Sequence, residues 1–278
     1  MNISFQEALE RAAVGKELSK ADLIALLSAD EEESVELFQL ADEVRAKFVG
    51  EEIHLRGIIE FSNYCKRNCK YCGLRKNNKY IKRYRMSPWE IIESAGRAAG
   101  LGCPTIVLQS GEDGYYSAEI LAEVIREIKK ANDVAITLSI GERSRQDYEL
   151  FKKAGADRYL LKHETSDPQL FNSLRPGTSL AQRLEKQRWL KDLDYQLGSG
   201  SMVGLPGQTV GIIADDILLF SKMGVEMVGI GPFIPSEGTP LKGYKGGTLD
   251  MTMKVIAATR LAMPFAHLPA TTAVASID

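Results

Sequence analysis

Apolar residues recur along the first fifty residues with the spacing of amphipathic helices. Residues three or four positions apart fall on the same side of a helix, which turns once in about 3.6 residues. The pattern predicts an N-terminal helical segment over residues 1–50. Three apolar groups define its helical faces: Phe5, Leu9 and Ala12; Leu23, Leu26 and Leu27; and Leu37, Leu40, Ala41 and Val44.

Beyond Gly50 the pattern changes to short apolar runs that alternate with amphipathic stretches such as 117–130 and 208–223. Strands that alternate with helices indicate a parallel sheet. We therefore expect residues 51–278 to form one (β/α) barrel, a fold that uses about 200–250 residues. The predicted strands are 53–60, 105–109, 134–139, 157–162, 197–203, 226–231 and 267–272.

Seven strands do not complete an eight-stranded barrel. The seventh predicted strand ends a few residues before Asp278. A barrel without its eighth strand has an open edge beside the first strand. We therefore expect a barrel that is short at its C-terminal end.

Composition and charge narrow the class of protein. The 278 residues are 44% hydrophobic and 26% charged, as in an ordinary globular protein. A net charge of −2 gives no overall basic footprint for nucleic acid or for an anionic membrane, so neither is an expected partner. No apolar run reaches about 18 residues, and the N-terminus lacks the apolar core of a signal peptide. These features lead us to expect a cytoplasmic protein.

Three of the four cysteines fall within eight residues, as Cys65-x3-Cys69-x2-Cys72. Four cysteines are too few for a disulfide framework in a chain of this length. Three thiolates on one loop after the first strand suit a metal or a cluster at the end of a barrel where active sites form. Cys103 precedes the second strand and is expected at the opposite end. A zinc site with His163 as fourth ligand is the alternative.

The cysteine spacing, with Tyr71 before the last cysteine, resembles the signature of the radical S-adenosylmethionine (radical SAM) superfamily. That resemblance implies a [4Fe–4S] cluster on Cys65, Cys69 and Cys72, with one iron open to SAM. It also implies reductive cleavage of SAM to methionine and a 5′-deoxyadenosyl radical. Longer stretches resemble the HydE-type [FeFe]-hydrogenase maturases: IIEFSNYCKRNCKYCGLR, IVLQSGEDGYY, ADRYLLKHET, GSMVGLPGQT and VGIGPFIP.

The resemblance implies an α/β fold: a (β/α) barrel of the radical SAM type with N-terminal helices, here without the last strand and the C-terminal cap. It also implies SAM contacts. Gly111 and Glu112 match the stretch that receives the SAM ammonium group. Glu164 and Arg183 match positions used for the ribose hydroxyls and the methionine carboxylate, which are chemically suitable pairs. The complete set of expected SAM contacts is Tyr71, Gln109, Gly111, Glu112, Ser139, Glu164, Arg183 and Ile230.

Each of these positions also has a structural interpretation. The Gly-Glu stretch could be a turn with an acidic cap, and Ser139 could cap a helix. Glu164 and Arg183 could form surface ion pairs, and Ile230 could belong to a plain buried strand.

Alternation along two strands gives a further hypothesis. Arg158 and Lys162 share a face with Glu164, and Arg56 shares a face with Glu60. Barrel interiors are normally apolar, and unpaired cations there are costly. We therefore predict an anion-binding cavity; internal ion pairs such as Arg56 with Glu60, or an inverted facing, are the alternatives. The candidate substrate residues are Arg56, Arg158, Lys162, Met227, Thr271 and Thr272.

The resemblance implies a function in assembly of the hydrogenase active-site cluster. The expected substrate is a small anionic iron–cysteine complex that carries CO and cyanide. The expected partners are an electron donor such as a ferredoxin or flavodoxin, and other hydrogenase maturases. Another radical SAM enzyme, such as a methylornithine synthase-like mutase, and a non-catalytic iron–sulfur scaffold are the alternatives. Biotin synthase is disfavoured because only Cys103 remains for a second cluster.

Overall fold

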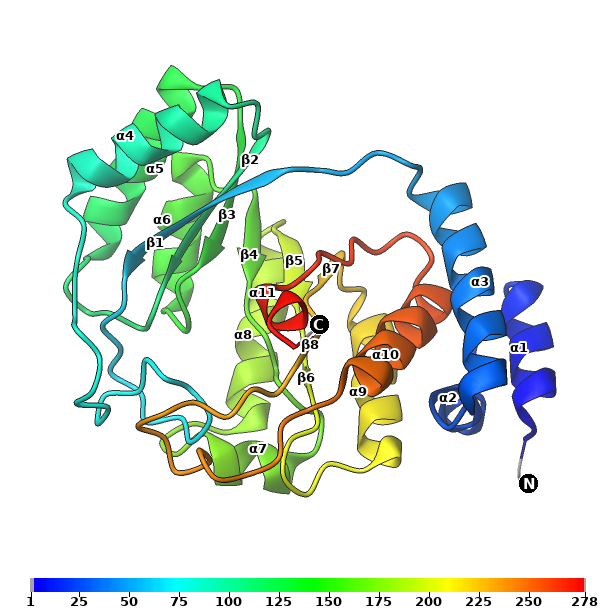
Figure 1. The fold of residues 1–278 in the computed structure, drawn as a ribbon. Helices are drawn as coiled ribbons and strands as arrows, with labels where there is room; N and C mark the ends of the chain where they lie inside the picture. Colours follow the sequence, from blue (N-terminus) through cyan, green and yellow to red (C-terminus); the bar gives the residue numbers. More distant parts are fainter. Residues whose placement is uncertain (1–2, 278) are drawn as a thin grey trace.

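The N-terminal segment is helical, as its periodicity predicts. The computed structural model describes residues 3–277. Its first helices are α1 (Phe5–Ala13), α2 (Lys20–Leu27) and α3 (Glu31–Phe48). Each begins with a capping box, in which the N-cap side chain and an acidic residue three positions later satisfy each other's backbone N–H groups. These helices pack on α9 and α10 at one side of the molecule (Figure 1).

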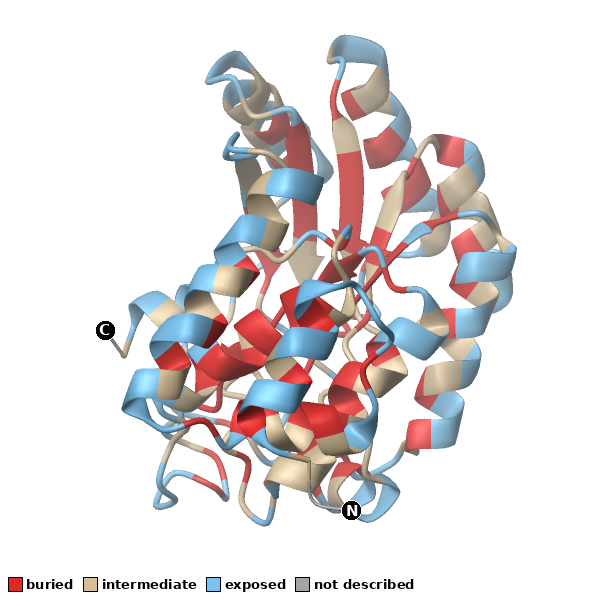
Figure 2. Cartoon of the chain, turned by 90° about the vertical axis from the view of Figure 1, so that its right-hand side faces the viewer, coloured by how far each residue is buried: buried red, intermediate tan, exposed pale blue. Residues whose placement is uncertain are grey.

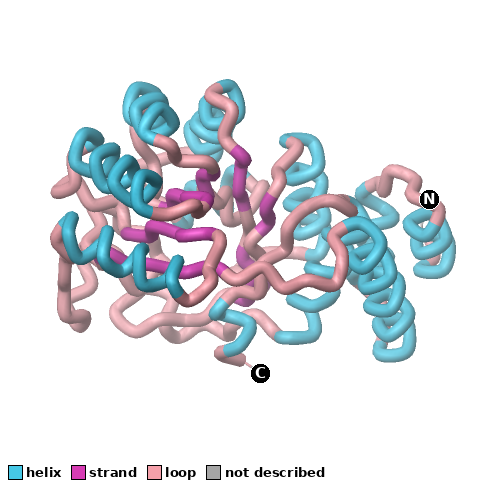
Figure 3. The backbone as a smooth tube through the Cα atoms, turned by 90° about the horizontal axis from the view of Figure 1, so that it is seen from above, coloured by secondary structure: helices cyan, strands magenta, loops and turns pink. Residues whose placement is uncertain are grey.

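The rest of the chain forms a curved parallel sheet with helices on its outer side (Figures 1 and 3). Six strands pair in the order β1-β2-β3-β4-β5-β7, and β6 pairs with β8 as a short continuation. The strands are β1 (Arg56–Ser62), β2 (Thr105–Ser110), β3 (Ala135–Ser139), β4 (Arg158–Leu160), β5 (Gln196–Ser199), β6 (Met202–Val203), β7 (Met227–Val228) and β8 (Gly231–Pro232). The helices that follow are α4 (Pro88–Gly100), α5 (Ala118–Ala131), α6 (Arg145–Ala154), α7 (Pro168–Leu174), α8 (Leu180–Asp192), α9 (Val210–Met223), α10 (Leu249–Ala262) and α11 (Thr272–Ala275).

The main core lies between the outer face of the sheet and the helices. Buried residues of the strands and the inward stripes of the helices meet there (Figure 2). Gly57 faces this layer, because a Cβ at that position would approach Ala98 of α4 to 2.7 Å. Its neighbours Arg56 and Ile58 therefore point to the inside of the barrel. The predicted facing of the first strand is confirmed.

The prediction of a strand over 267–272 is wrong. His267 makes a single bridge to Met227, and the helix α11 begins at Thr272. Pro269 has no backbone N–H to donate to a strand ladder, which interrupts extended pairing at this point.

The predicted strands 197–203 and 226–231 are each divided in two. Gly200 and Gly229 lie between the halves, and a Cβ on Gly200 would come within 2.2 Å of the Gly229 carbonyl oxygen. The two backbones therefore approach each other more closely than side chains would permit. Within residues 3–277, no helix is long and apolar enough to cross a membrane.

Candidate functional site

The cysteine loop begins where β1 ends and lies over the carboxyl ends of the strands. Cys65, Cys69 and Cys72 line one cavity of about 230 Å³. The sulfur of Cys65 accepts backbone N–H groups of Arg67 and Glu112, each at 3.4 Å. These two contacts hold the Cys65 sulfur in place at the cavity.

The chemistry of the three thiols fits a cluster better than a single zinc ion. Zinc requires its ligands within about 2.0–2.3 Å of one point. Among the described residues, no three Cys, His, Asp or Glu side chains converge on such a point. Three thiols around one cavity would instead suit a cluster that several cysteines hold together. Burial raises the pKa of Cys72 to about 11, so binding of iron at this thiol would displace a proton.

The proposed fourth zinc ligand lies elsewhere. His163 is fully buried, with Nδ1 at 3.1 Å from the Ser199 hydroxyl, and its ring packs against Phe220. Burial lowers the pKa of His163 to about 3, so the ring is neutral. Cys103 also lies outside the cavity, near Gly57 on the outer side of the sheet. The zinc alternative is therefore not supported.

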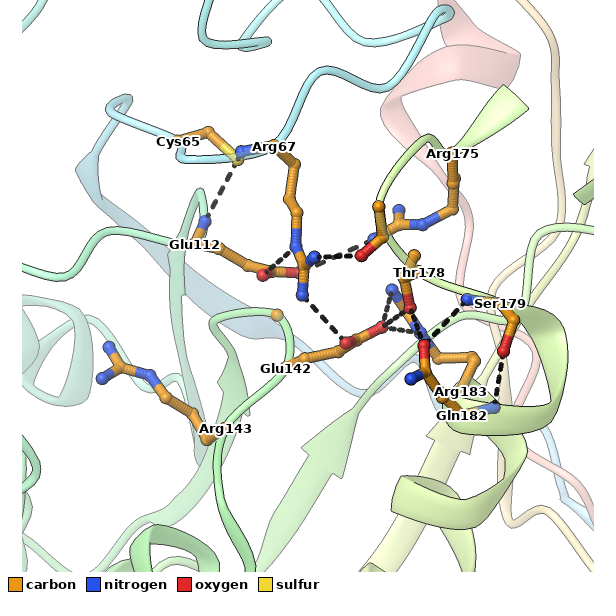
Figure 4. A network of polar contacts seen from close by, with 12 residues as sticks. Cys65, Arg67, Glu112, Glu142, Arg143, Arg175, Thr178, Ser179, Gln182 and Arg183 are labelled. Atoms are coloured by element: carbon orange, nitrogen blue, oxygen red, sulfur yellow. Dashed lines mark hydrogen bonds and ion pairs between the residues drawn. The ribbon is translucent and has the colours of Figure 1, made fainter. Parts of the chain in front are cut away.

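A buried ion network joins the cysteine loop to the loops after β2 and β3 (Figure 4). The Arg67 Nε lies 2.5 Å from Glu112 Oε2, and its Nη2 lies 3.0 Å from Glu142 Oε2. Arg183 of α8 pairs with the other oxygen of Glu142 at 2.9 Å. Burial acts to raise the pKa of Glu142, but Arg183 and Arg67 outweigh it and hold that pKa below its ordinary value. The Glu142 carboxylate is therefore ionised, and the ion pairs fix both carboxylates in position.

A second group of polar side chains surrounds Tyr71. Its hydroxyl lies 3.3 Å from Glu164 Oε1 and accepts a hydrogen bond from Arg175 at 2.8 Å. Arg175 also lies 3.6 Å from Glu112. This arginine follows α7 directly and was not anticipated, because neither helical periodicity nor motif spacing distinguishes it from a surface cation.

The backbone at the site is constrained at several points. Glu164 has a φ of 67°, an unusual conformation for a residue with a side chain and one that is concentrated at functional sites. A Cβ at Gly141 would come within 2.1 Å of the Glu112 side chain, and a Cβ at Gly111 within 2.3 Å of the Tyr64 carbonyl oxygen. Glycine at both positions lets these loops pack closely around the cavity.

Seven of the eight expected SAM contacts line the cavity that holds the cysteines: Tyr71, Gln109, Gly111, Glu112, Ser139, Glu164 and Arg183. The eighth, Ile230, is buried between β7 and β8 and does not line it. The cavity that the three cysteines line is named the upper cavity. Lys162 is expected at the substrate cavity but lines the upper cavity instead. The individual SAM contacts stay predictions.

A parallel α/β barrel with three cysteines around a cavity at its carboxyl end defines a radical SAM protein. Residues 59–220 match the family model of the Radical SAM superfamily. Within this superfamily, the chain belongs to the family of the [FeFe] hydrogenase maturase subunit HydE. It is 52% identical to HydE of Thermotoga maritima over 271 residues, which cover 98% of this chain and 77% of that protein.

Other relatives share the fold at lower identity. The 3-methylornithine synthase of Methanosarcina acetivorans is 33% identical over 97% of this chain and 77% of its own length. A crystal structure of methylornithine synthase (PylB) superimposes with a TM-score of 0.89 at 30% identity, covering 95% of this chain and 78% of that one.

The first prediction concerns the cluster ligands. Anaerobic reconstitution should give about four irons per chain, because the chain has one cysteine triplet. Replacement of Cys65, Cys69 or Cys72 by Ala should abolish the iron–sulfur absorbance, whereas Cys103→Ala should retain it. About eight irons per chain, or loss of iron in Cys103→Ala, would contradict this assignment.

The second prediction concerns Glu164. Glu164→Gln keeps the size of the side chain but removes the charge at the cavity. The Kd for SAM of the cluster-loaded protein should rise by an amount equivalent to about 1–3 kcal/mol, the usual cost of damaging a charged hydrogen bond. Glu185→Gln, on the exposed side of α8, is the matched control and should leave the Kd unchanged. If Glu164→Gln and Glu185→Gln, both folded and cluster-loaded, bind SAM with equal affinity, a direct contact between Glu164 and SAM is excluded.

Proposed function

We propose that this chain is a HydE-type maturase that cleaves SAM reductively and acts in assembly of the [FeFe]-hydrogenase active-site cluster. The observation that carries the proposal is the 52% identity to HydE along 98% of the chain, together with the three cysteines around one cavity. When bound, a [4Fe–4S] cluster supplies an open iron for SAM and the electron that cleaves it. The methylornithine synthases, at 33% identity or less, are weaker matches.

The residues of the upper cavity have the chemistry to hold SAM. Glu112 and Glu164 offer carboxylates to an ammonium group and to ribose hydroxyls. Arg183 offers a guanidinium to a carboxylate, and its ion pair with Glu142 fixes the direction in which it points. Tyr71 and Arg175 keep the Glu164 carboxylate in place. Pre-positioned groups of this kind lower the cost of ordering a ligand.

A second cavity of about 210 Å³, named the lower cavity, lies at the opposite end of the barrel interior. Arg56 and Arg158 line it, and neither forms an ion pair with a described residue. Burial and the nearby Arg158 lower the pKa of Arg56, so the folded protein disfavours its charge. Glu60 accepts a hydrogen bond from Gln109 at 3.0 Å, which does not support the alternative of an Arg56–Glu60 pair.

The remaining contacts of this cavity leave it cationic. Arg158 is held by neutral groups, the Gln196 side chain at 2.5 Å and the Thr105 hydroxyl at 3.1 Å. The one carboxylate in its lining, Glu226, accepts the Leu197 backbone N–H at 2.6 Å. Two arginines against one carboxylate support binding of a small anion.

The candidate substrate residues divide accordingly. Arg56, Arg158 and Met227 line the lower cavity, whereas Lys162 lines the upper one. The Thr271 hydroxyl donates to the Ile230 carbonyl at 3.0 Å, and Thr272 begins α11; neither residue lines either cavity. We propose that Lys162 and the lower arginines act on the anionic iron–cysteine substrate with CO and cyanide, and that other maturases supply and receive it.

The proposed function is tested by asking whether this chain can replace HydE in a hydrogenase maturation assay. The reconstituted chain is added to a hydrogenase maturation mixture that lacks only HydE, and hydrogen evolution and release of 5′-deoxyadenosine are measured. We expect both to appear. Release of 5′-deoxyadenosine without active hydrogenase would support a different radical SAM reaction, and absence of both would support the scaffold alternative.

The third prediction concerns Arg56→Met. Since the folded protein disfavours the charge on Arg56, its removal should leave the Tm unchanged or raise it. The same change should reduce the yield of active hydrogenase while SAM cleavage continues. Arg97→Met, on the exposed side of α4, is the control and should affect neither measurement. Full maturation by a folded Arg56→Met variant would exclude a role for this cation in substrate binding.

A further inference from the structure

Charge is distributed very unevenly along the chain. Residues 61–89, here named the basic segment, contain nine Lys or Arg residues and no Asp or Glu. Subtracting these nine charges from the formal charge of −2 leaves −11 for the rest of the chain. The basic segment includes the cysteine loop and lies at the carboxyl end of the barrel, where the arrowheads of β1 to β3 point (Figure 1).

The cations of the basic segment have two different roles. Arg67 and Arg85 pair with buried carboxylates of the neighbouring loop, Glu112 and Asp113. The lysines after the last cysteine are exposed, and none forms an ion pair with a described residue: Lys76, Lys79 and Lys82. The first group supports the site, whereas the second presents uncompensated positive charge to solvent.

Large aromatic side chains are exposed in the same segment. Tyr80 is 85% exposed, Trp89 is 67% exposed and Tyr84 is 42% exposed. Tyrosine and tryptophan are enriched at protein interfaces, where they provide most of the binding energy with little loss of conformational entropy. Exposed aromatics among unpaired lysines are thus typical of a surface that binds an acidic protein.

The turn that carries the lysines is held in one conformation. Arg83 donates to the carbonyl oxygens of Leu74 and Arg75 at 2.9 and 2.7 Å. The Asn78 side chain donates to the Gly73 carbonyl at 2.7 Å and accepts the Tyr80 N–H at 2.9 Å. A pre-formed surface loses less entropy when a partner binds.

We infer that the basic segment is the docking surface for a small acidic one-electron carrier protein of the flavodoxin or ferredoxin class. This inference rests on the proposed function, because reductive cleavage of each SAM consumes one electron from outside. The carrier is oxidised by one electron, and the cluster on Cys65, Cys69 and Cys72 is reduced by one. Docking on the segment that holds those cysteines keeps the transfer distance short.

The charge of the rest of the chain favours this position. The rest of the chain has a formal charge of −11, which repels an acidic carrier, whereas the basic segment, with nine cations and no carboxylate, attracts it. Complementary charge of this kind accelerates encounter and selects the orientation of the partner, and salt weakens it.

The fourth prediction tests this docking surface with two matched triple variants of the cluster-loaded protein. Lys76, Lys79 and Lys82 are changed to Glu in one, and Lys16, Lys153 and Lys222, which are exposed elsewhere, in the other. Release of 5′-deoxyadenosine is driven either by reduced flavodoxin or by dithionite at low salt. With flavodoxin, the rate of the first variant should fall about tenfold or more, and the control should stay near wild type. With dithionite, all three proteins should react equally.

Two further measurements distinguish a failure of the docking inference from a failure of the proposed function. Binding of oxidised flavodoxin should weaken as salt increases for the wild type and should be weak in the first variant at any salt, whether or not SAM is cleaved. Tyr80→Ser, which removes an exposed ring and no charge, should also weaken binding. Equal flavodoxin binding and equal flavodoxin-driven rates in both triple variants would overturn the inference. So would binding of a DNA duplex in preference to flavodoxin. No product from the wild type with dithionite would instead contradict the proposed function.

Discussion

The geometry of the site depends on the two ion pairs that Arg67 forms with Glu112 and Glu142. Arg67 joins a loop after β1 to loops after β2 and β3, and Arg183 extends the link to α8. Removal of one partner from a buried pair costs about 3–5 kcal/mol, because it leaves the other charge uncompensated. The cysteine loop, which has no strand ladder of its own, is therefore fixed to three separate parts of the barrel by charge.

That constraint explains how a polar interior is compatible with a stable fold. The apolar core lies outside the sheet, between strands and helices, and surrounds an interior that is available for chemistry. In the upper cavity, Glu112, Glu142 and Glu164 lie near Arg67, Arg175 and Arg183, and Lys162 also lines this cavity. The lower cavity has an excess of positive charge. Its two unpaired arginines lie where the proposed anionic substrate would reside, at a cost in stability that the outer core offsets.

The sequence permits prediction of features that depend on short-range pattern. Alternation placed Arg56 on the inner face of β1 correctly, and the spacing of the cysteines identified the loop that lines the upper cavity. The sequence pattern did not reveal Arg175, because the importance of this residue comes from contacts with Tyr71 and Glu112, which lie more than sixty positions away in the sequence. The prediction of a strand over 267–272 was wrong because this run contains Pro269, which has no backbone N–H to donate to a strand ladder.

The distribution of charge connects the exterior of the protein with its interior. A net charge of −2 suggests little electrostatic specificity, yet it is the sum of +9 for the basic segment and −11 for the rest of the chain. Most of that segment's cations either fix the cysteine loop or point to solvent beside it. The lower arginines are half-buried and lie at the other end of the barrel, away from the surface lysines. Because the two cationic regions lie at opposite ends, the proposed electron carrier and the proposed anionic substrate would not compete for the same charges.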